Sequence, residues 1–211
     1  TKRNKAIGRK VSQSSIDRIN NASDILAFLE FNNSTAIQTL ESKLKNDGKR
    51  KINATSSGAG NKNIYYTQNG IYQKNSILKC RTLGKCFLVE QPKPIWKITQ
   101  TSKIIGGYLC YRAEYQNPIY KYKKPVAWFA PKIPARYGPK IFTGLPGLIL
   151  ELEDNIVTFT AIKIELNPKE KIVIEKPEAK AISKENYEKL LRKQFPDFYK
   201  DWEKYKKLKK S

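Results

Sequence analysis

Short runs of β-branched and aromatic residues, separated by glycine, proline or asparagine, recur through the middle of the chain. Apolar residues at helical spacing are absent there. This rhythm is typical of an antiparallel meander, so we expect a mainly β protein. The segments expected to form strands are CFLVE, PIWKITQTSKII, GGYLCYRAEYQ, PVAWFA, LILELED, NIVTFTAIKIEL and KIVIEKP.

Earlier in the chain, Asn69-Gly70 stands between two aromatic, β-favouring runs. Both central residues of a type I′ turn need positive φ, which Asn-Gly provides, so we predict a hairpin here. The segment DILAFLEF, residues 24–31, is apolar enough for a buried strand, and TAIQTLESKL, residues 35–44, is either a returning strand or a short helix.

Two segments differ in composition from the runs expected to form strands. Residues 1–22 are basic and polar, which indicates a loosely ordered arm or a single edge strand. Residues 46–63 are rich in Gly, Ser, Asn and Lys and are expected to form a flexible loop.

Residues 183–211 are expected to form a basic, amphipathic helical region of one or two helices. Ser183 is a suitable N-cap for KENYEKLLRKQF, and Pro196 ends that helix. Beyond it, four apolar side chains recur at helical spacing, and we regard them as candidate partner-binding residues. They are Phe198, Trp202, Tyr205 and Leu208.

The formal net charge is +22, and most of the basic residues are lysine. Arginine supplies the bidentate fork that favours phosphates and base edges, whereas lysine also serves as solubilising surface. The charge therefore favours anionic surroundings, such as an anionic membrane surface or another polyanion, and indicates nucleic acid less. A general lysine-rich surface is the alternative.

The chain offers little chemistry. It has no histidine, which removes the commonest acid–base group and metal ligand, and with it every Cys–His or Ser–His–Asp device. In LILELED, Glu151 and Glu153 alternate with leucines, which is typical of the solvated face of a strand more than of a paired-carboxylate or cation site. We predict no enzyme activity, no catalytic residues, no metal and no cofactor.

Three cysteines are present: Cys80, Cys86 and Cys110. In an oxidising compartment one bridge is possible, and the six-residue spacing of Cys80 and Cys86 fits the closed end of a hairpin. In the cytosol all three would be free, and buried cysteines packed as small apolar groups are the alternative.

The stretch YGPKIFTGLPGLILELED, residues 137–154, is dense in glycine and proline. A phosphate-binding loop needs G-x-G-x-x-G between a strand and a helix, but here a strand follows, and the prolines remove amide donors. Two stiff turns that aim Phe142 and Leu145 into the core are the favoured interpretation, and a rim facing a ligand or partner is the alternative.

The segment AWFAPKIPARYGPKIFTGLPGLILELED, residues 127–154, resembles the signature of the GLPGLI family of Bacteroidetes proteins, and residues 103–115 resemble the segment that usually precedes it. The matching positions, expected to be structural, are Trp128, Phe129, Ile133, Pro134, Gly138, Pro139, Phe142, Gly144, Leu145, Pro146, Gly147, Leu148 and Ile149.

The resemblance implies a GLPGLI-type β domain over residues 23–182 and a curved sheet, half-barrel or barrel-like, by analogy with lipoprotein carriers. The family has no established activity. Its members resemble exported proteins with a signal peptide, encoded near TonB-dependent receptors of the outer membrane. We therefore expect a periplasmic or outer-membrane-associated protein of the cell envelope, with its signal peptide removed.

That location suggests an accessory subunit that binds an outer-membrane transporter or a secretion component. Two alternatives remain from the sequence. One is a periplasmic carrier or chaperone that binds a lipid or peptide in the curved sheet. The other is a polyanion-binding protein.

Overall fold

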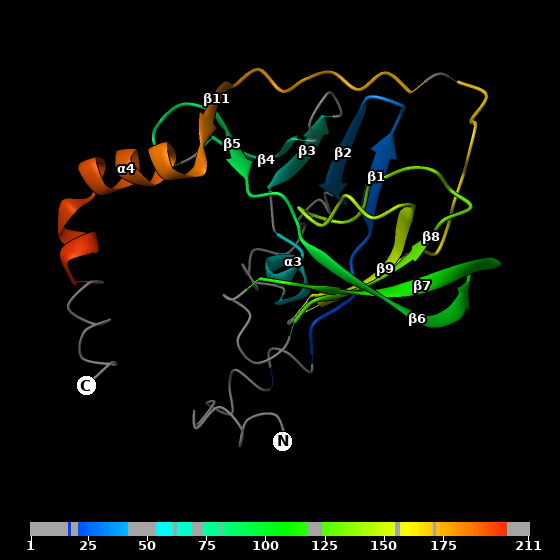
Figure 1. Ribbon diagram of the computed structural model, residues 1–211. Helices are drawn as coiled ribbons and strands as arrows, with labels where there is room; N and C mark the ends of the chain where they lie inside the picture. Colours follow the sequence, from blue (N-terminus) through cyan, green and yellow to red (C-terminus); the bar gives the residue numbers. More distant parts are fainter. Residues whose placement is uncertain are drawn as a thin grey trace.

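The computed structural model describes residues 17, 21–41, 54–60, 63–68, 74–80, 82–117, 124–154, 157–170 and 172–201. These residues form a mainly β protein with two sheets and short helices (Figure 1). The mainly β prediction is therefore confirmed. No helix among the described residues is both long and apolar enough to cross a membrane.

Sheet A has six strands in the order β1-β2-β3-β4-β5-β11. Their bounds are β1 Ala27–Phe31, β2 Thr35–Leu40, β3 Ile64–Gln68, β4 Lys74–Lys79, β5 Phe87–Gln91 and β11 Lys180–Ser183. The first five strands pair antiparallel in chain order, and β11 is added parallel to β5.

Sheet B has five strands in the order β10-β9-β8-β7-β6, all antiparallel. Their bounds are β6 Trp96–Ile105, β7 Tyr108–Tyr115, β8 Val126–Ala130, β9 Leu148–Asp154 and β10 Val157–Thr160. Register shifts interrupt the pairing of β6 with β7 and of β8 with β9, so two strands of this sheet carry bulges.

The meander prediction describes each sheet but not the break between them. The chain leaves sheet A after β5 and enters sheet B at β6 through residues 92–95, which include Pro92 and Pro94. A proline has no N–H to donate to a neighbouring strand, so pairing stops there. The strands before and after this segment therefore belong to two separate sheets.

Near the end of the chain one strand prediction is too long and a second is wrong for the residues that the structure describes. Of NIVTFTAIKIEL, only Val157–Thr160 is a described strand, and residues 172–177 of KIVIEKP form none. In Figure 1 this part of the chain crosses as an extended segment from β10 to β11, which pairs with β5 instead. Alternating apolar residues produce a strand only where a neighbour accepts the backbone bonds.

In the N-terminal half, residues 35–40 form strand β2, which decides between the strand and the helix that the sequence allowed. The segment expected to be a buried strand contains β1, which is an edge strand with Phe28 half exposed, so that expectation is corrected. Strands β3 and β4 pair as the predicted hairpin, with Gln68 opposite Lys74, although Asn69 and Gly70 lie outside the described residues.

Within the segment expected to be a flexible loop, residues 54–58 form the short helix α3 (Ala54–Gly58), and Ala59 beyond it is buried. The loop prediction is corrected for these residues. The other residues of 46–63, apart from Gly60 and Asn63, and nearly all of the 1–22 arm lie outside the described residues.

Helix α4 (Lys184–Gln194) begins where the sequence predicts. The Ser183 hydroxyl accepts a hydrogen bond from the Asn186 amide, and the helix packs through Tyr187 and Leu191 on Phe87 and Val89 of sheet A. Residues 196–201 are again helical after Phe195. In Figure 1, α4 and this last turn extend away from the two sheets.

Candidate functional site

The segment that carries the glycine- and proline-rich motif connects β8 to β9 and is here called the motif loop, residues 131–147. Its aromatic and aliphatic side chains are almost fully buried: Tyr137, Phe142 and Leu145 expose 2%, 1% and 1% of their surface. Tyr137 belongs to a core cluster that includes residues of β1 and β2, whereas Phe142 and Leu145 pack with residues of sheet B. The motif loop therefore joins the cores of the two sheets.

Its backbone is fixed on sheet B. The Ile149 amide donates to the Tyr137 carbonyl oxygen at 3.0 Å, and the Gly144 amide donates to the Arg136 carbonyl oxygen at 2.9 Å. At Gly138 a Cβ atom would lie 2.5 Å from the Phe142 carbonyl oxygen and 2.8 Å from Cβ of Ile149. Only glycine fits at this close approach.

A second set of contacts fixes the motif loop on sheet A. Asn75 of β4, which is 3% exposed, accepts hydrogen bonds from the hydroxyls of Thr67 and Thr143 at 3.2 and 3.0 Å. Its amide nitrogen lies 3.5 Å from the Ile141 carbonyl oxygen, and the Trp96 indole donates to the Thr143 carbonyl oxygen at 2.8 Å. The buried polar groups thus hold the motif loop between a strand of each sheet.

Lys140 is the one charged residue of this buried arrangement that enters from the motif loop. Its ammonium pairs with the Asp154 carboxylate at the end of β9 and donates to the Gly58 carbonyl oxygen of α3 at 3.2 Å. The two side chains are only 17% and 8% exposed, and Lys140 adopts a positive φ of 59°. Its backbone amide donates to the Gln38 side chain of β2.

Lys140 therefore links the motif loop to β9 and α3 through its side chain and to β2 through its backbone, a set of contacts that the sequence did not predict. The available signal was a lone lysine between Pro139 and Ile141, in a stretch otherwise made of apolar and turn residues. Burial also affects Tyr65, next to α3: desolvation raises the pKa of its phenol, the hydrogen bond with Asn63 lowers it, and the charge of Asp154 raises it further.

Most of the residues predicted from the motif pack inside the protein. Eight are buried, namely Phe129, Ile133, Gly138, Phe142, Leu145, Gly147, Leu148 and Ile149, whereas Trp128, Pro139 and Gly144 are partly buried. Pro134 and Pro146 are exposed. Most motif residues are therefore used in packing, and Pro134 and Pro146 are the two that are fully on the surface.

Sheet B carries charged side chains that are partly buried, and Glu151, predicted on a solvated face, is only 16% exposed. Lys103 of β6 donates to the Glu151 carboxylate at 2.7 Å and lies over the Trp128 ring, 4.3 Å from its centroid. Glu151 therefore has a cationic partner and is not one half of a carboxylate pair. The hydrogen bond from Arg112 holds the pKa of Glu114 below its ordinary value.

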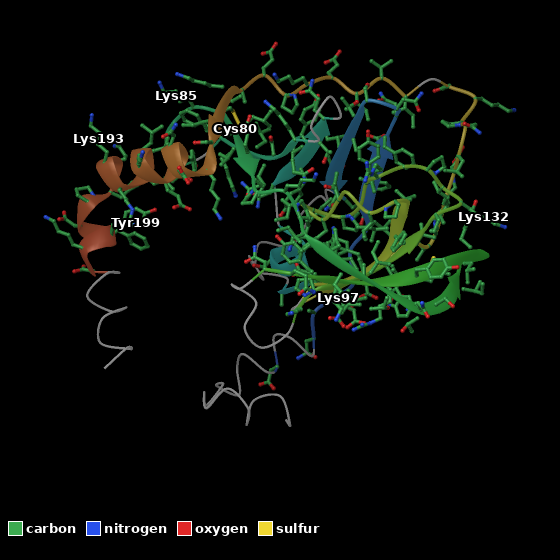
Figure 2. All side chains as sticks on the ribbon, viewed as in Figure 1. Cys80, Lys85, Lys97, Lys132, Lys193 and Tyr199 are labelled. Atoms are coloured by element: carbon green, nitrogen blue, oxygen red, sulfur yellow. A yellow bond between two sulfur atoms is a disulfide. The ribbon has the colours of Figure 1, made fainter. Side chains whose placement is uncertain are left out.

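The three cysteines form one disulfide and leave one free thiol. Cys80 and Cys86 form a disulfide just before β5, visible beside the Cys80 label in Figure 2. Cys110 is a free thiol, fully buried, and burial raises its pKa above the ordinary value. A buried thiol of this kind is inert. Among the described residues, no group of three or more His, Cys, Asp or Glu side chains could hold a metal ion.

Of the candidate partner-binding residues, Phe198 is 64% exposed and stacks edge-on against Tyr199, with ring centroids 5.4 Å apart. Trp202, Tyr205 and Leu208 lie outside the described residues. Figure 2 shows Tyr199 beside the helical turn that follows α4, and Arg192 lies over its ring, 4.8 Å from the centroid. This end of the molecule presents aromatic and basic side chains to solvent.

Comparison with known proteins gives one match. Residues 116–151 match a family described as a protein of unknown function, Porph_ging. The matched range covers β8, the motif loop and the first half of β9. No curated protein and no solved structure matches the chain.

Proposed function

We propose that this chain is a GLPGLI family protein of the cell envelope that acts without catalysis, as a partner-binding accessory subunit of an outer-membrane transporter or secretion complex. The observation that carries the proposal is that its apolar residues form two groups, one buried and one exposed. The motif side chains are buried between the sheets, whereas Phe195 and Phe198, at the projecting C-terminal end, are 39% and 64% exposed. Aromatic side chains exposed beside basic ones are typical of a docking element.

The Cys80–Cys86 disulfide supports export. Disulfides persist in oxidising compartments such as the periplasm and are rare in the cytosol. The placement of Cys110 is consistent with this, because a buried thiol is protected from unwanted exchange in such a compartment.

The test is recovery of partners from the native envelope by crosslinking and affinity purification, followed by mass spectrometry. We expect truncation after Phe195, and the single change Phe198→Ser, to reduce recovery of the same envelope proteins. The matched control is Ile162→Ser, which alters an 81% exposed apolar residue far from this end in sequence. Unchanged recovery with both C-terminal variants would refute the docking role.

A carrier that binds a lipid or peptide on a curved, half-barrel sheet is the second candidate. The two bulges of sheet B favour it, because a bulge bends its strand and increases the local twist. Mass spectrometry of an organic extract of the purified protein tests this candidate. An extract free of lipid and peptide would count against it.

Polyanion binding is the third candidate, and the net charge of +22 favours it. Counterion release makes such affinity fall steeply as salt rises. A salt titration with heparin as the probe tests it, and binding that does not depend on salt would contradict it.

A further inference from the structure

We propose that the outer edge of β6 binds an extended, acidic segment of another protein, which adds a strand to sheet B. This surface lies on a different sheet from α4 and does not depend on the C-terminal docking element. The argument rests on the position, length, side chains and charge of β6.

β6 is the terminal strand of sheet B, with β7 on one side and no further described strand on the other. It has ten residues, whereas the other edge strands of the described sheets, β1, β10 and β11, have five, four and four. Natural proteins keep exposed edges short, because the unpaired N–H and C=O groups of a long edge accept another chain. β6 departs from that rule.

Apolar side chains of β6 are exposed to solvent and would be buried by a neighbouring strand. Ile98 and Ile104 are 49% and 66% exposed, and Leu109, directly opposite Ile104 on β7, is 40% exposed. An added strand would cover part of this apolar surface. In strand addition the backbone bonds supply affinity, and contacts with alternate side chains supply specificity.

The usual protections of an edge are incomplete on β6. Lys103 turns inward onto Glu151 and Trp128 and does not guard the edge. The bulge between Ile98 and Ser102 bends the strand, yet the exposed residues 100–102 are uncharged. Lysine and bulges are the common devices against edge pairing, and here they cover only part of the strand.

Charge indicates the kind of partner. The chain carries +22, and Lys97 on β6 is exposed. A second copy would bring the same net charge, and residues 1–16 of this chain contain basic residues and no acidic one. Both would be repelled. An acidic segment is the complementary occupant.

The experiment uses a fluorescent peptide as long as β6 in which valine and glutamate alternate, and measures its binding to the full chain by anisotropy. Two further versions carry N-methyl groups on one or the other alternate set of amides. Because only one edge of the peptide pairs with β6, one N-methylated version should bind about tenfold more weakly or worse and the other should bind like the parent. Equal binding of all three would overturn strand addition.

Substitutions on β6 and hydrogen exchange of its amides show whether the peptide binds at this edge. Ile98→Ser with Ile104→Ser removes the apolar contact without changing the charge and should weaken binding by about tenfold, while the control Ile162→Ser, at an 81% exposed residue, should leave it unchanged. Hydrogen exchange should slow at the amides of residues 96–105 that point away from β7 when the peptide is added. Protection of these outward amides before peptide is added, a dimer in light scattering, or equal binding of a valine–lysine peptide would each overturn the proposal.

Truncation after Phe195 should leave peptide binding unchanged. Failure of this proposal is therefore distinguishable from failure of the C-terminal docking role.

Discussion

Replacement of Gly138 by alanine is the sharpest test of how the motif loop is held. The backbone φ of Gly138 is not positive, so alanine brings no conformational strain, only a methyl group in an occupied place. That group would meet the Phe142 carbonyl oxygen at 2.5 Å and Cδ1 and Cβ of Ile149 at 2.6 and 2.8 Å. A carbonyl and a β-carbon cannot rotate away, so the two segments must separate.

Overpacking of this kind costs about 1 to 3 kcal/mol, and we expect the upper end because the contacts lie between buried segments. The matched control is Gly84→Ala, where φ is +70° and nothing lies within 4 Å of the new methyl group. There the cost is only that of the left-handed conformation, about 1 kcal/mol.

Urea denaturation measures both variants, and the midpoints are compared at equal m-value. For a chain of this size, a loss of about 3 kcal/mol corresponds to a melting temperature lower by roughly 6 to 12 °C. If Gly138→Ala were no less stable than Gly84→Ala, the close approach of the motif loop to β9 would be refuted.

Three further outcomes follow from the structure. Asp154→Asn leaves the buried ammonium beside it without its counter-charge and should destabilise the fold by about 3 kcal/mol in urea denaturation, since removal of one partner of a buried pair is costly; a loss below about 1 kcal/mol would contradict the buried pair. Reduction of the Cys80–Cys86 bridge should lower stability by about 2 kcal/mol in the same assay, the chain-entropy value for a short closed loop, and an unchanged midpoint would contradict it. Glu114 has a lowered pKa because Arg112 donates to it, so its contribution to stability is present at neutral pH and is lost as pH falls below the ordinary value of 4.5. In Arg112→Gln the pKa of Glu114, followed by carboxyl NMR, should rise toward that value, and an unmoved pKa would contradict the assigned cause.

Some elements can be predicted from residues that lie close together in the sequence. The β3–β4 hairpin, the start of α4 at Ser183 and the alternation of leucine and glutamate in β9 all appear where the sequence predicts them. Each depends on short-range preferences: turn propensity, a capping hydroxyl and a period of two.

Other features depend on segments far apart in the chain. Asn75 meets Thr143, and Lys140 joins Gly58 to Asp154, because two sheets close on the motif loop. Residues 171–177 show as clear a strand pattern as β9, yet β11 is the segment that pairs with β5. A local pattern cannot indicate which segment will find a neighbour.

The sequence by itself determined that the chain is mainly β and that its glycine- and proline-rich stretch is unsuited to hold a phosphate. Only the tertiary structure decided that this stretch lies buried between two sheets, that its lysine is paired, and that β6 remains as a long edge. The physical reason is that strand propensity is local, whereas burial and pairing are set by the surfaces that distant segments present to one another.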